Sequence, residues 1–397
     1  MRDLAILGAE PAFPEALHVG RPNLGDRERF VQRVEDIFDR RWLTNNGPYV
    51  QGFERLVAER CGVRECIATC NGTIALELLI RGVGMEGEVI VPSYTFVATA
   101  HALQWQGIRP VFCDVDPATH TLDPARVEEL ITPNTTGIVG VHLWGNACDT
   151  TALEAVGRKH GIPVIFDASH AFGCRHQGRP IGGFGAGEVF SFHATKVLNC
   201  FEGGAILTDD PELAEKLRLM RNFGFESKDN VVYLGSNGKM SEVSAAMGLT
   251  SLESVDEFVG INRRNFELYR EELRGLTGVR LLEPLHPEGF NYHYVVLEIE
   301  GAELSRDQMV QVLEAENVLA RRYFFPGVHN MEPYRSLQPM AGLPLPQTAR
   351  LSDIVMTLPT GTSVGKSEIE VIASIMRAAL CRPEQVAEAL AIPSGDA

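Results

Sequence analysis

The sequence is poor in positive charge and contains no long apolar run. Its 36 Lys and Arg residues stand against 52 Asp and Glu residues, which gives a formal net charge of −16 at pH 7. Such a surface repels the phosphates of nucleic acids and the headgroups of acidic lipids. No apolar stretch approaches the roughly 20 residues that a transmembrane helix needs. The composition therefore speaks against nucleic acid and membranes as partners.

The eight cysteines lack the spacing of a metal site. No two of them form a C-x-x-C pair, and no histidines follow at the spacing of a zinc site. They stand at positions 61, 66, 70, 113, 148, 174, 200 and 381. The first residues, MRDLAILGAEPAF, do not show the basic and then apolar pattern of a secretory signal. We therefore expect no metal and a reducing, cytoplasmic location.

The composition and the order of predicted elements indicate an α/β protein. Hydrophobic residues make up 45% of the 397 residues, enough for a large core. Between about residues 60 and 210, runs rich in β-branched residues alternate with helical patterns. The predicted strands are Glu88–Val91, Pro110–Val115, Gly137–Leu143, Pro163–Asp167, Glu188–Phe192 and Gly204–Thr208. Because runs such as IPVIF are apolar almost throughout, we expect a mainly parallel sheet covered on both faces.

The pattern changes after a helical stretch near 241–275. The elements predicted beyond it are a strand at Tyr294–Ile299, a helix with a Ser305-x-x-Gln308 capping box, a strand near Val355–Leu358 and a helix after Ser367-x-x-Glu370. This order indicates a smaller α+β part.

The length of the chain predicts two or three domains. We expect an N-terminal segment and a large domain over 1–255, a small C-terminal domain over 256–390, and a frayed tail over 391–397.

Lys196 follows the predicted strand Glu188–Phe192 in the segment SFHATKVLNCFEGG. The glycines Gly203 and Gly204 behind it let the backbone come close to a ligand. A lysine near a strand end is most often a solvated charge. In a desolvated place, however, its amine is a nucleophile that forms a Schiff base with an aldehyde. The spacing alone leaves both interpretations open.

Asp167 ends the predicted strand of the segment VIFDASHA, where open α/β sheets bind their ligands. It either caps the next helix or points into a cleft. A buried carboxylate needs a partner, and the protonated pyridine nitrogen of pyridoxal phosphate is a suitable one. His170, three residues later, is either structural or a hydrogen-bond partner of the cofactor's phenolic oxygen.

Two further segments open helices after predicted strands or turns. In TCNGTIAL, Gly72 and Thr73 offer backbone N–H groups and a hydroxyl at a helix start, which suits a phosphate, although such a turn is often only a cap. In PSYTFVATA, the ring of Phe96 either packs in the core or stacks on a flat ligand.

Taken together and in order, these motifs resemble one family. SFHATK with EGG, FDASHAFG, CNGTIAL, PSYTFVATA and GSNGKMSE are similar to the DegT/DnrJ/EryC1/StrS family of sugar aminotransferases. The likeness runs from Leu43–Glu54 to Arg321–Tyr334. The resemblance implies a fold-type I aminotransferase architecture with a large, mainly parallel sheet domain, homodimers, and pyridoxal 5'-phosphate as the cofactor.

The resemblance also implies roles for single residues. It makes Lys196 the Schiff-base lysine and Asp167 the partner of the pyridine nitrogen. His170 lies near the phenolic oxygen and Phe96 against the ring. The residues implied for the phosphate are Gly72, Thr73 and Ser191, joined by Asn237 of the neighbouring subunit, which makes the active site composite.

The implied substrate is a nucleotide-linked keto sugar. Members that aminate C4 resemble the SFH form, so His193 favours C4 of a 4-keto-6-deoxyhexose such as dTDP-4-keto-6-deoxyglucose, with glutamate as the donor. The products serve deoxysugar biosynthesis for antibiotics or cell-surface polysaccharides. Tyr323 and His329 are candidates for sugar or diphosphate contacts, or else surface and structural groups. Lys239, where Arg is frequent, and Phe201, where Gly is commoner, are departures near the expected sugar pocket.

Other functions remain as alternatives. One is a C3 keto-sugar aminotransferase. Another is a pyridoxal-phosphate-dependent sugar dehydratase, in which a His replaces the lysine, so Lys196 speaks against it. The third takes Gly183, Gly185 and Gly187 as the dinucleotide loop of an NAD-dependent oxidoreductase, but these glycines precede a predicted strand instead of opening a helix.

Overall fold

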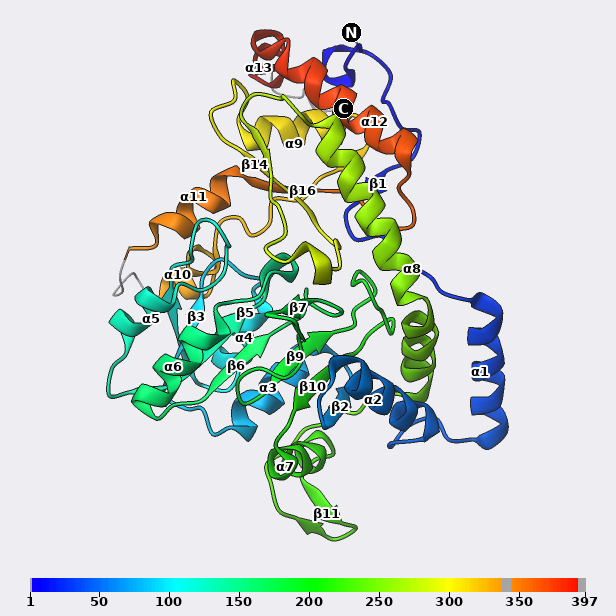
Figure 1. Cartoon of the computed structure of the whole chain (residues 1–397), viewed down its shortest axis with the longest axis vertical. Helices are drawn as coiled ribbons and strands as arrows, with labels where there is room; N and C mark the ends of the chain where they lie inside the picture. The colour runs from blue at the N-terminus through cyan, green and yellow to red at the C-terminus, as the bar shows by residue number, and fades with distance from the viewer. Residues whose placement is uncertain (1, 338–343, 392–397) are drawn as a thin grey trace.

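A seven-stranded sheet lies at the centre of the chain, whose computed structural model describes residues 2–337 and 344–391 (Figure 1). Its strands, in sheet order, are β2 (Glu65–Thr69), β10 (Gly204–Thr208), β9 (Glu188–Ser191), β6 (Val164–Asp167), β5 (Thr135–Val141), β3 (Glu88–Pro92) and β4 (Arg109–Cys113). β10 runs antiparallel to both of its neighbours, and every other pair is parallel. The predicted mainly parallel sheet is confirmed.

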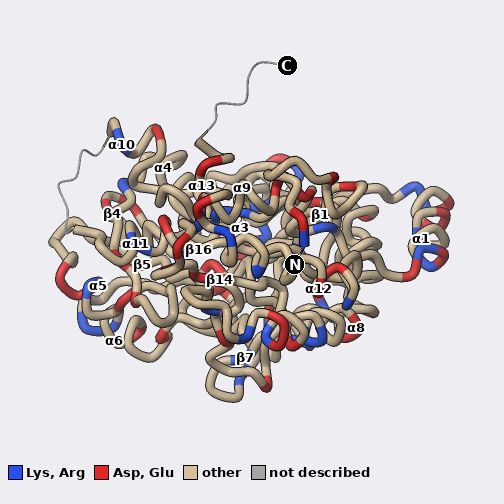
Figure 2. The backbone as a smooth tube through the Cα atoms, turned by 90° about the horizontal axis from the view of Figure 1, so that it is seen from above, with Lys and Arg blue, Asp and Glu red and all other residues tan. Residues whose placement is uncertain are grey.

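Both faces of this sheet are buried, because alternate residues of each strand enter different cores. Ile165 of β6 packs in one core with α3 and α7, whereas its neighbour Phe166 packs in the other with α2 and α8. The helices of this part are α1 (Arg27–Arg40), α2 (Pro48–Cys61), α3 (Gly72–Gly82), α4 (Ala98–Gln104), α5 (Pro124–Leu130), α6 (Thr150–His160), α7 (Pro211–Arg221) and α8 (Glu242–Glu272). α1 packs on α8 and lies at the right edge of the molecule in both views (Figures 1 and 2). The remaining strands are two short hairpins, β7 (Arg175–His176) with β8 (Arg179–Pro180) and β11 (Phe225–Ser227) with β12 (Asn230–Val231).

The C-terminal part is built on a three-stranded antiparallel sheet in the order β13–β14–β16. Its elements are β13 (Val279–Leu281), β14 (Val295–Ile299), α9 (Arg306–Ala315), β15 (Val318–Leu319), α10 (Tyr334–Leu337), α11 (Pro346–Ile354), β16 (Val355–Leu358), α12 (Lys366–Leu380) and α13 (Pro383–Ala391). The predicted strands at β14 and β16 and the Ser305 capping box of α9 are confirmed.

The predicted start of the last long helix at Ser367 is wrong. α12 begins at Lys366, and Gly365 is its N-cap. The carboxylate of Glu368 accepts a 2.8 Å hydrogen bond from the backbone N–H of Gly365, so the reciprocal half of a capping box forms two residues earlier than the sequence pattern predicts.

The two parts of the chain are joined by more than one segment. α8 is a single helix of 31 residues that packs on α2 near its start and on α12 near its end, and residue 255 lies inside it. β1 (Leu17–His18) pairs with β15, and the buried Glu316 accepts hydrogen bonds from the backbone of Ala5 and Ala12. The N-terminal segment therefore packs on the C-terminal part, while the division at residue 255 stays a prediction. Residues 392–397 of the predicted tail lie outside the described residues.

Candidate active site

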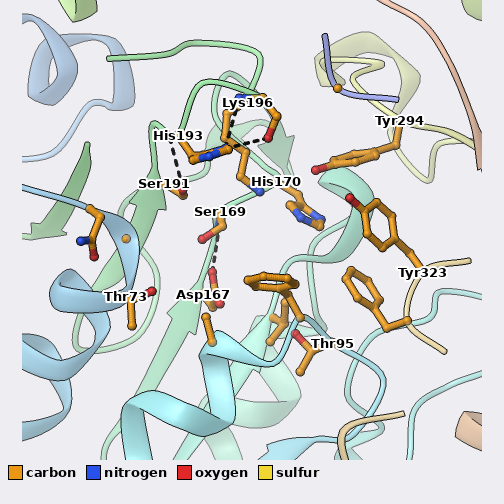
Figure 3. A pocket seen from close by; sticks show the side chains of 18 of the residues that line it. Thr73, Thr95, Asp167, Ser169, His170, Ser191, His193, Lys196, Tyr294 and Tyr323 are labelled. Carbon is orange, nitrogen blue, oxygen red and sulfur yellow. Dashed lines mark hydrogen bonds between the residues drawn. The ribbon is translucent and has the colours of Figure 1, made fainter. Parts of the chain in front are cut away.

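A cavity of about 560 Å³ opens where β6 and β9 end and α3 begins. Nine of the twelve site residues that the sequence predicts line it: Gly72, Thr73, Phe96, Asp167, His170, Ser191, His193, Lys196 and Tyr323. In Figure 3, Thr73 and Ser191 lie on one side and Tyr294 and Tyr323 on the other, with Asp167 and Lys196 between them. The cavity therefore lies at the carboxyl ends of parallel strands, as expected for an open α/β sheet.

Lys196 lies in the loop between β9 and β10 and is half-buried. Its backbone N–H donates to the carbonyl of His193 over 2.9 Å, which closes a turn just after β9. Burial lowers the pKa of the Lys196 amine to about 8, although the nearby carboxylate of Asp167 acts in the opposite direction. About a tenth of this amine is therefore neutral near pH 7, far more than for a free lysine, and the neutral form is the one that attacks an aldehyde.

Asp167 is the last residue of β6 and is only 5% exposed. The hydroxyl of Thr99 on α4 donates to its Oδ2 over 2.9 Å, and the backbone N–H of Ser169 donates to Oδ1 over 3.0 Å. Both donors are neutral, so they leave the charge of the carboxylate available to a cationic group in the cavity. A protonated pyridine nitrogen fits this position.

His170 forms part of the wall beside Asp167 and is buried. Its Nδ1 accepts a hydrogen bond of 3.4 Å from the backbone N–H of Trp144, and its ring is tilted against Tyr294 at a centroid distance of 4.5 Å. Burial, helped by the positive charge of Lys196, lowers the pKa of His170 well below its usual range. The imidazole is therefore neutral with its proton on Nε2, which makes it a hydrogen-bond donor for a ligand oxygen.

The start of α3 supplies an anion-binding end of the cavity. The side chain of Asn71 accepts from the backbone N–H of Ile74 and caps the helix, so the N–H groups of Gly72 and Thr73 stay available in its first turn. Ser191 approaches closely, because a Cβ added at Gly72 would lie 3.0 Å from the Cβ of Ser191. Two backbone donors and two hydroxyls thus converge at a helix N-terminus, which fits a phosphate.

The ring of Phe96 lines the cavity and is 56% exposed, which is unusual for a phenylalanine between a buried strand and a buried helix. Of the two interpretations that the sequence leaves open for Phe96, packing in the core is therefore wrong. An exposed aromatic face in a pocket is suited to stacking on a flat ring.

Three predicted site residues do not line the cavity. Asn237 is exposed, and its Oδ1 accepts a 2.6 Å hydrogen bond from the Nζ of Lys239. The Lys239 ammonium lies 4.5 Å from the ring centroid of Phe223. His329 shares a 2.6 Å hydrogen bond between its Nδ1 and the Oγ of Ser93 at the end of β3. Within one chain, none of these three side chains therefore reaches the interior of the cavity.

Sequence reasoning missed four side chains that shape the site. Arg321, Tyr294 and Glu202 line the cavity, and Thr99 holds Asp167. Thr99 had a signal, because it lies one helical turn after Phe96 and faces the same sheet edge. Arg321 and Tyr294 had none, since they reach the cavity only because the C-terminal part packs against the central sheet.

Candidate sites of other kinds are not found in the described part of the chain. Over residues 2–337 and 344–391, no group of three or more His, Cys, Asp or Glu side chains is arranged to hold a metal ion. In the same residues, no helix has the length and apolarity that crossing a membrane requires. The glycine segment 182–187 leads into β9 and opens no helix, which removes the context of a dinucleotide loop.

Comparison with known proteins agrees with this geometry. Residues 25–377 match the DegT/DnrJ/EryC1/StrS aminotransferase family. A dTDP-4-amino-4,6-dideoxy-D-glucose transaminase of Shigella dysenteriae is 39% identical over 364 residues, which cover 91% of this chain and 98% of that protein. A GDP-perosamine synthase of Caulobacter vibrioides is 38% identical over 328 residues, which cover 81% and 87%.

The similarity extends to the three-dimensional structure. The crystal structure of DesI in the presence of its TDP-sugar product has 47% sequence identity to this chain and a TM-score of 0.93, and the match covers 97% of this chain and 98% of that one. These matches confirm the expected aminotransferase fold and the expected cofactor, pyridoxal phosphate. The chain belongs to the DegT/DnrJ/EryC1/StrS family and is a sugar aminotransferase.

Proposed function

We propose that this enzyme transfers an amino group from glutamate to C4 of a nucleotide-linked 4-keto-6-deoxyhexose, with dTDP-4-keto-6-deoxyglucose as the favoured substrate. The observation that carries the proposal is that one cavity joins a lysine of lowered pKa, a buried carboxylate and an anion-binding helix start. The names of the Shigella relative and of the DesI complex support a thymidine-diphosphate sugar.

The residues of the cavity divide the chemistry among them. When bound, pyridoxal phosphate supplies an aldehyde that condenses with amines and a ring that accepts an electron pair. The Nζ of Lys196 would take the proton from the donor's α carbon and return it on the cofactor side. Asp167 holds the proton of the pyridine nitrogen, and His170 donates from Nε2 toward the phenolic oxygen.

Arg321 and Tyr323 are suited to bind the sugar nucleotide or the donor. Arg321 is exposed toward the cavity, and its guanidinium carbon lies 5.2 Å from the ring centroid of Tyr323. Among the described residues it makes no ion pair with a carboxylate of this chain. A cation of this kind attracts a diphosphate or the carboxylates of glutamate. The rings of Tyr294 and Tyr323 offer flat walls for a sugar ring.

The proposal includes a homodimer with composite active sites. Asn237 is exposed and does not line the cavity of its own chain. Beside it, the segment 223–234 exposes several large apolar side chains: Phe223, Phe225, Val231, Val232, Tyr233 and Leu234. Such a patch is typical of a protein interface, which would let Asn237 reach a neighbour's phosphate.

The eight free cysteines support action in the reducing cytoplasm, in deoxysugar biosynthesis for an antibiotic or a polysaccharide.

The test is an incubation of the pure enzyme with glutamate and thymidine-diphosphate 4-keto-6-deoxyglucose, followed by NMR of the product. An amine on C4 and one equivalent of 2-oxoglutarate are the expected results. No amination of this sugar, together with amination of its 3-keto isomer, would support the C3 alternative, and loss of a hydroxyl without amination would support the dehydratase. A parallel reaction with alanine in place of glutamate measures the donor preference.

A further inference from the structure

The short segment 291–293, just before β14, connects two loops of the active site. The side chain of Asn291 is fully buried, and its Nδ2 donates to the carbonyls of His170 over 2.9 Å and of Phe172 over 3.1 Å. The backbone carbonyl of Asn291 accepts a 3.2 Å hydrogen bond from the side-chain Nδ2 of Asn262 on α8. Asn291 therefore fixes the loop that follows Asp167.

His293 holds the other loop. Its Nε2 lies 2.8 Å from the carbonyl oxygen of Thr195, the residue before Lys196. Because a carbonyl only accepts, the proton of the imidazole is on Nε2. The backbone N–H of His293 donates to the Oδ1 of Asn291 over 3.1 Å, so the residues that hold the two loops are also bonded to each other. We call residues 291–293 the clip.

The imidazole of His293 is neutral in this place. Its ring is 8% exposed, and its Nδ1 has no hydrogen-bond partner among the described residues. Burial, helped by the positive charge of Lys196, lowers the pKa of His293 to about 4. It therefore acts at neutral pH as a fixed donor to the Thr195 carbonyl and not as an acid or base.

We propose that His293 is a positioning residue for Lys196: by holding the Thr195 carbonyl, it directs the lysine side chain toward the cofactor aldehyde. This inference rests on the proposed function. The clip ties the Lys196 loop and the Asp167–His170 loop to the same three residues at the start of β14. The distance between the lysine and the ring-binding residues is thus set by a segment of the C-terminal part.

Two forms of the cofactor separate a positioning role from a structural one. The Nζ of Lys196 condenses with the aldehyde carbon of pyridoxal phosphate, with loss of one water. Pyridoxamine phosphate has the same ring and phosphate but carries an amine at that carbon, so it forms no bond to the lysine. A misplaced lysine weakens the binding of the first form alone, whereas a damaged pocket weakens both.

The experiment compares His293→Gln with His293→Asn in the full chain, stripped of cofactor and reloaded with either form. The glutamine amide nitrogen occupies the position of the imidazole Nε2, whereas that of asparagine stops near Nδ1. We expect His293→Gln to keep both affinities within about twofold of the unsubstituted chain. His293→Asn should lose about 10-fold in affinity for pyridoxal phosphate, with less than a twofold change for pyridoxamine phosphate.

Equal weakening of both forms in His293→Asn, or unchanged binding of both, would overturn the proposal. If that variant does not yield folded protein by circular dichroism, His293→Phe keeps the ring volume without the donor, and the same ratio of affinities decides. Failure of the proposed function is distinguishable, because it appears in the sugar product of the unsubstituted chain, whereas the ratio of the two cofactor affinities is measured without sugar or amino donor.

Discussion

The carboxylate of Asp167 offers a test in which stability and cofactor binding change in opposite directions. It is 5% exposed and accepts hydrogen bonds from two neutral donors, Thr99 and Ser169. Without a cationic ligand, this buried charge costs free energy that its neutral partners only partly offset. Asp167→Asn keeps the shape and removes the charge. We therefore expect the cofactor-free variant to melt at the same temperature as the unsubstituted protein or above it.

In the presence of the cofactor, Asp167→Asn should weaken cofactor binding and slow the half-reaction. A hydrogen bond to a charged partner contributes about 1.5–3 kcal/mol, so its loss reduces cofactor affinity about 10- to 100-fold. The transamination half-reaction should slow at least as much, because the ring nitrogen no longer keeps its proton. Thermal shift with and without pyridoxal phosphate measures the first effect, and stopped-flow absorbance with glutamate measures the second.

A matched control separates the effect of the substitution on stability from its effect on cofactor binding. Asp114 is also 5% exposed, and it accepts hydrogen bonds from Gln347 and Thr348 at the start of α11, away from the cavity. Asp114→Asn should lower the melting temperature with and without cofactor and leave the absorbance spectrum unchanged. Nearly normal half-reaction rates in Asp167→Asn would refute the reasoning and reduce Asp167 to a loop-stabilising residue.

Four further outcomes follow from the geometry of the cavity and its surroundings. Lys196→Ala should bind cofactor without the borohydride-sensitive visible band and without turnover, and Lys196→Arg should do no better; turnover at the normal rate would contradict the assignment. Because the pKa of Lys196 is about 8 and only the neutral amine reacts, uptake of pyridoxal phosphate by the cofactor-free protein should accelerate as pH rises to 8 and level off above it; an uptake rate that still climbs at pH 10 would disagree. Mixed dimers of Lys196→Ala and Asn237→Ala chains should regain activity up to half the normal value per dimer, and no recovery after subunit exchange proven by mass spectrometry would place both residues in one site of one chain. Arg321→Gln should raise the KM of the sugar nucleotide or of glutamate about 10-fold with kcat within about twofold, whereas Arg322→Gln, whose guanidinium pairs with Asp307 outside the cavity, should change neither KM.

The central sheet could be predicted from the sequence because its strands are short apolar runs, and two of them end in polar residues that can bind a ligand. Asp167 ends β6 and Ser191 ends β9, so the position of each in its strand already places it at the ligand-binding edge. The start of α12 could not be placed correctly, because both Ser367-x-x-Glu370 and Gly365 with Glu368 satisfy a capping pattern. Local sequence does not decide between two caps that lie two residues apart.

The side chains that join the cavity from the C-terminal part were beyond sequence reasoning for a different reason. Tyr294 and His293 lie beside Lys196 only because β14 docks on the loop after β9, about 100 residues earlier in the chain. No periodicity or spacing encodes such a contact. The motif likeness implies roles for residues expected to contact the cofactor, and it implies nothing for the clip.

The pairing of β1 with β15 has a consequence for the order in which the chain can fold during synthesis. Leu17 and its partner Val318 are separated by about 300 residues, which a ribosome adds in roughly 15 to 60 s at 5–20 residues per second. Throughout that interval β1 has no strand to pair with, whereas the partner of Asn23, whose backbone carbonyl accepts a hydrogen bond from Asn199, is made earlier. The residues of β1 are thus among the last to reach their final place.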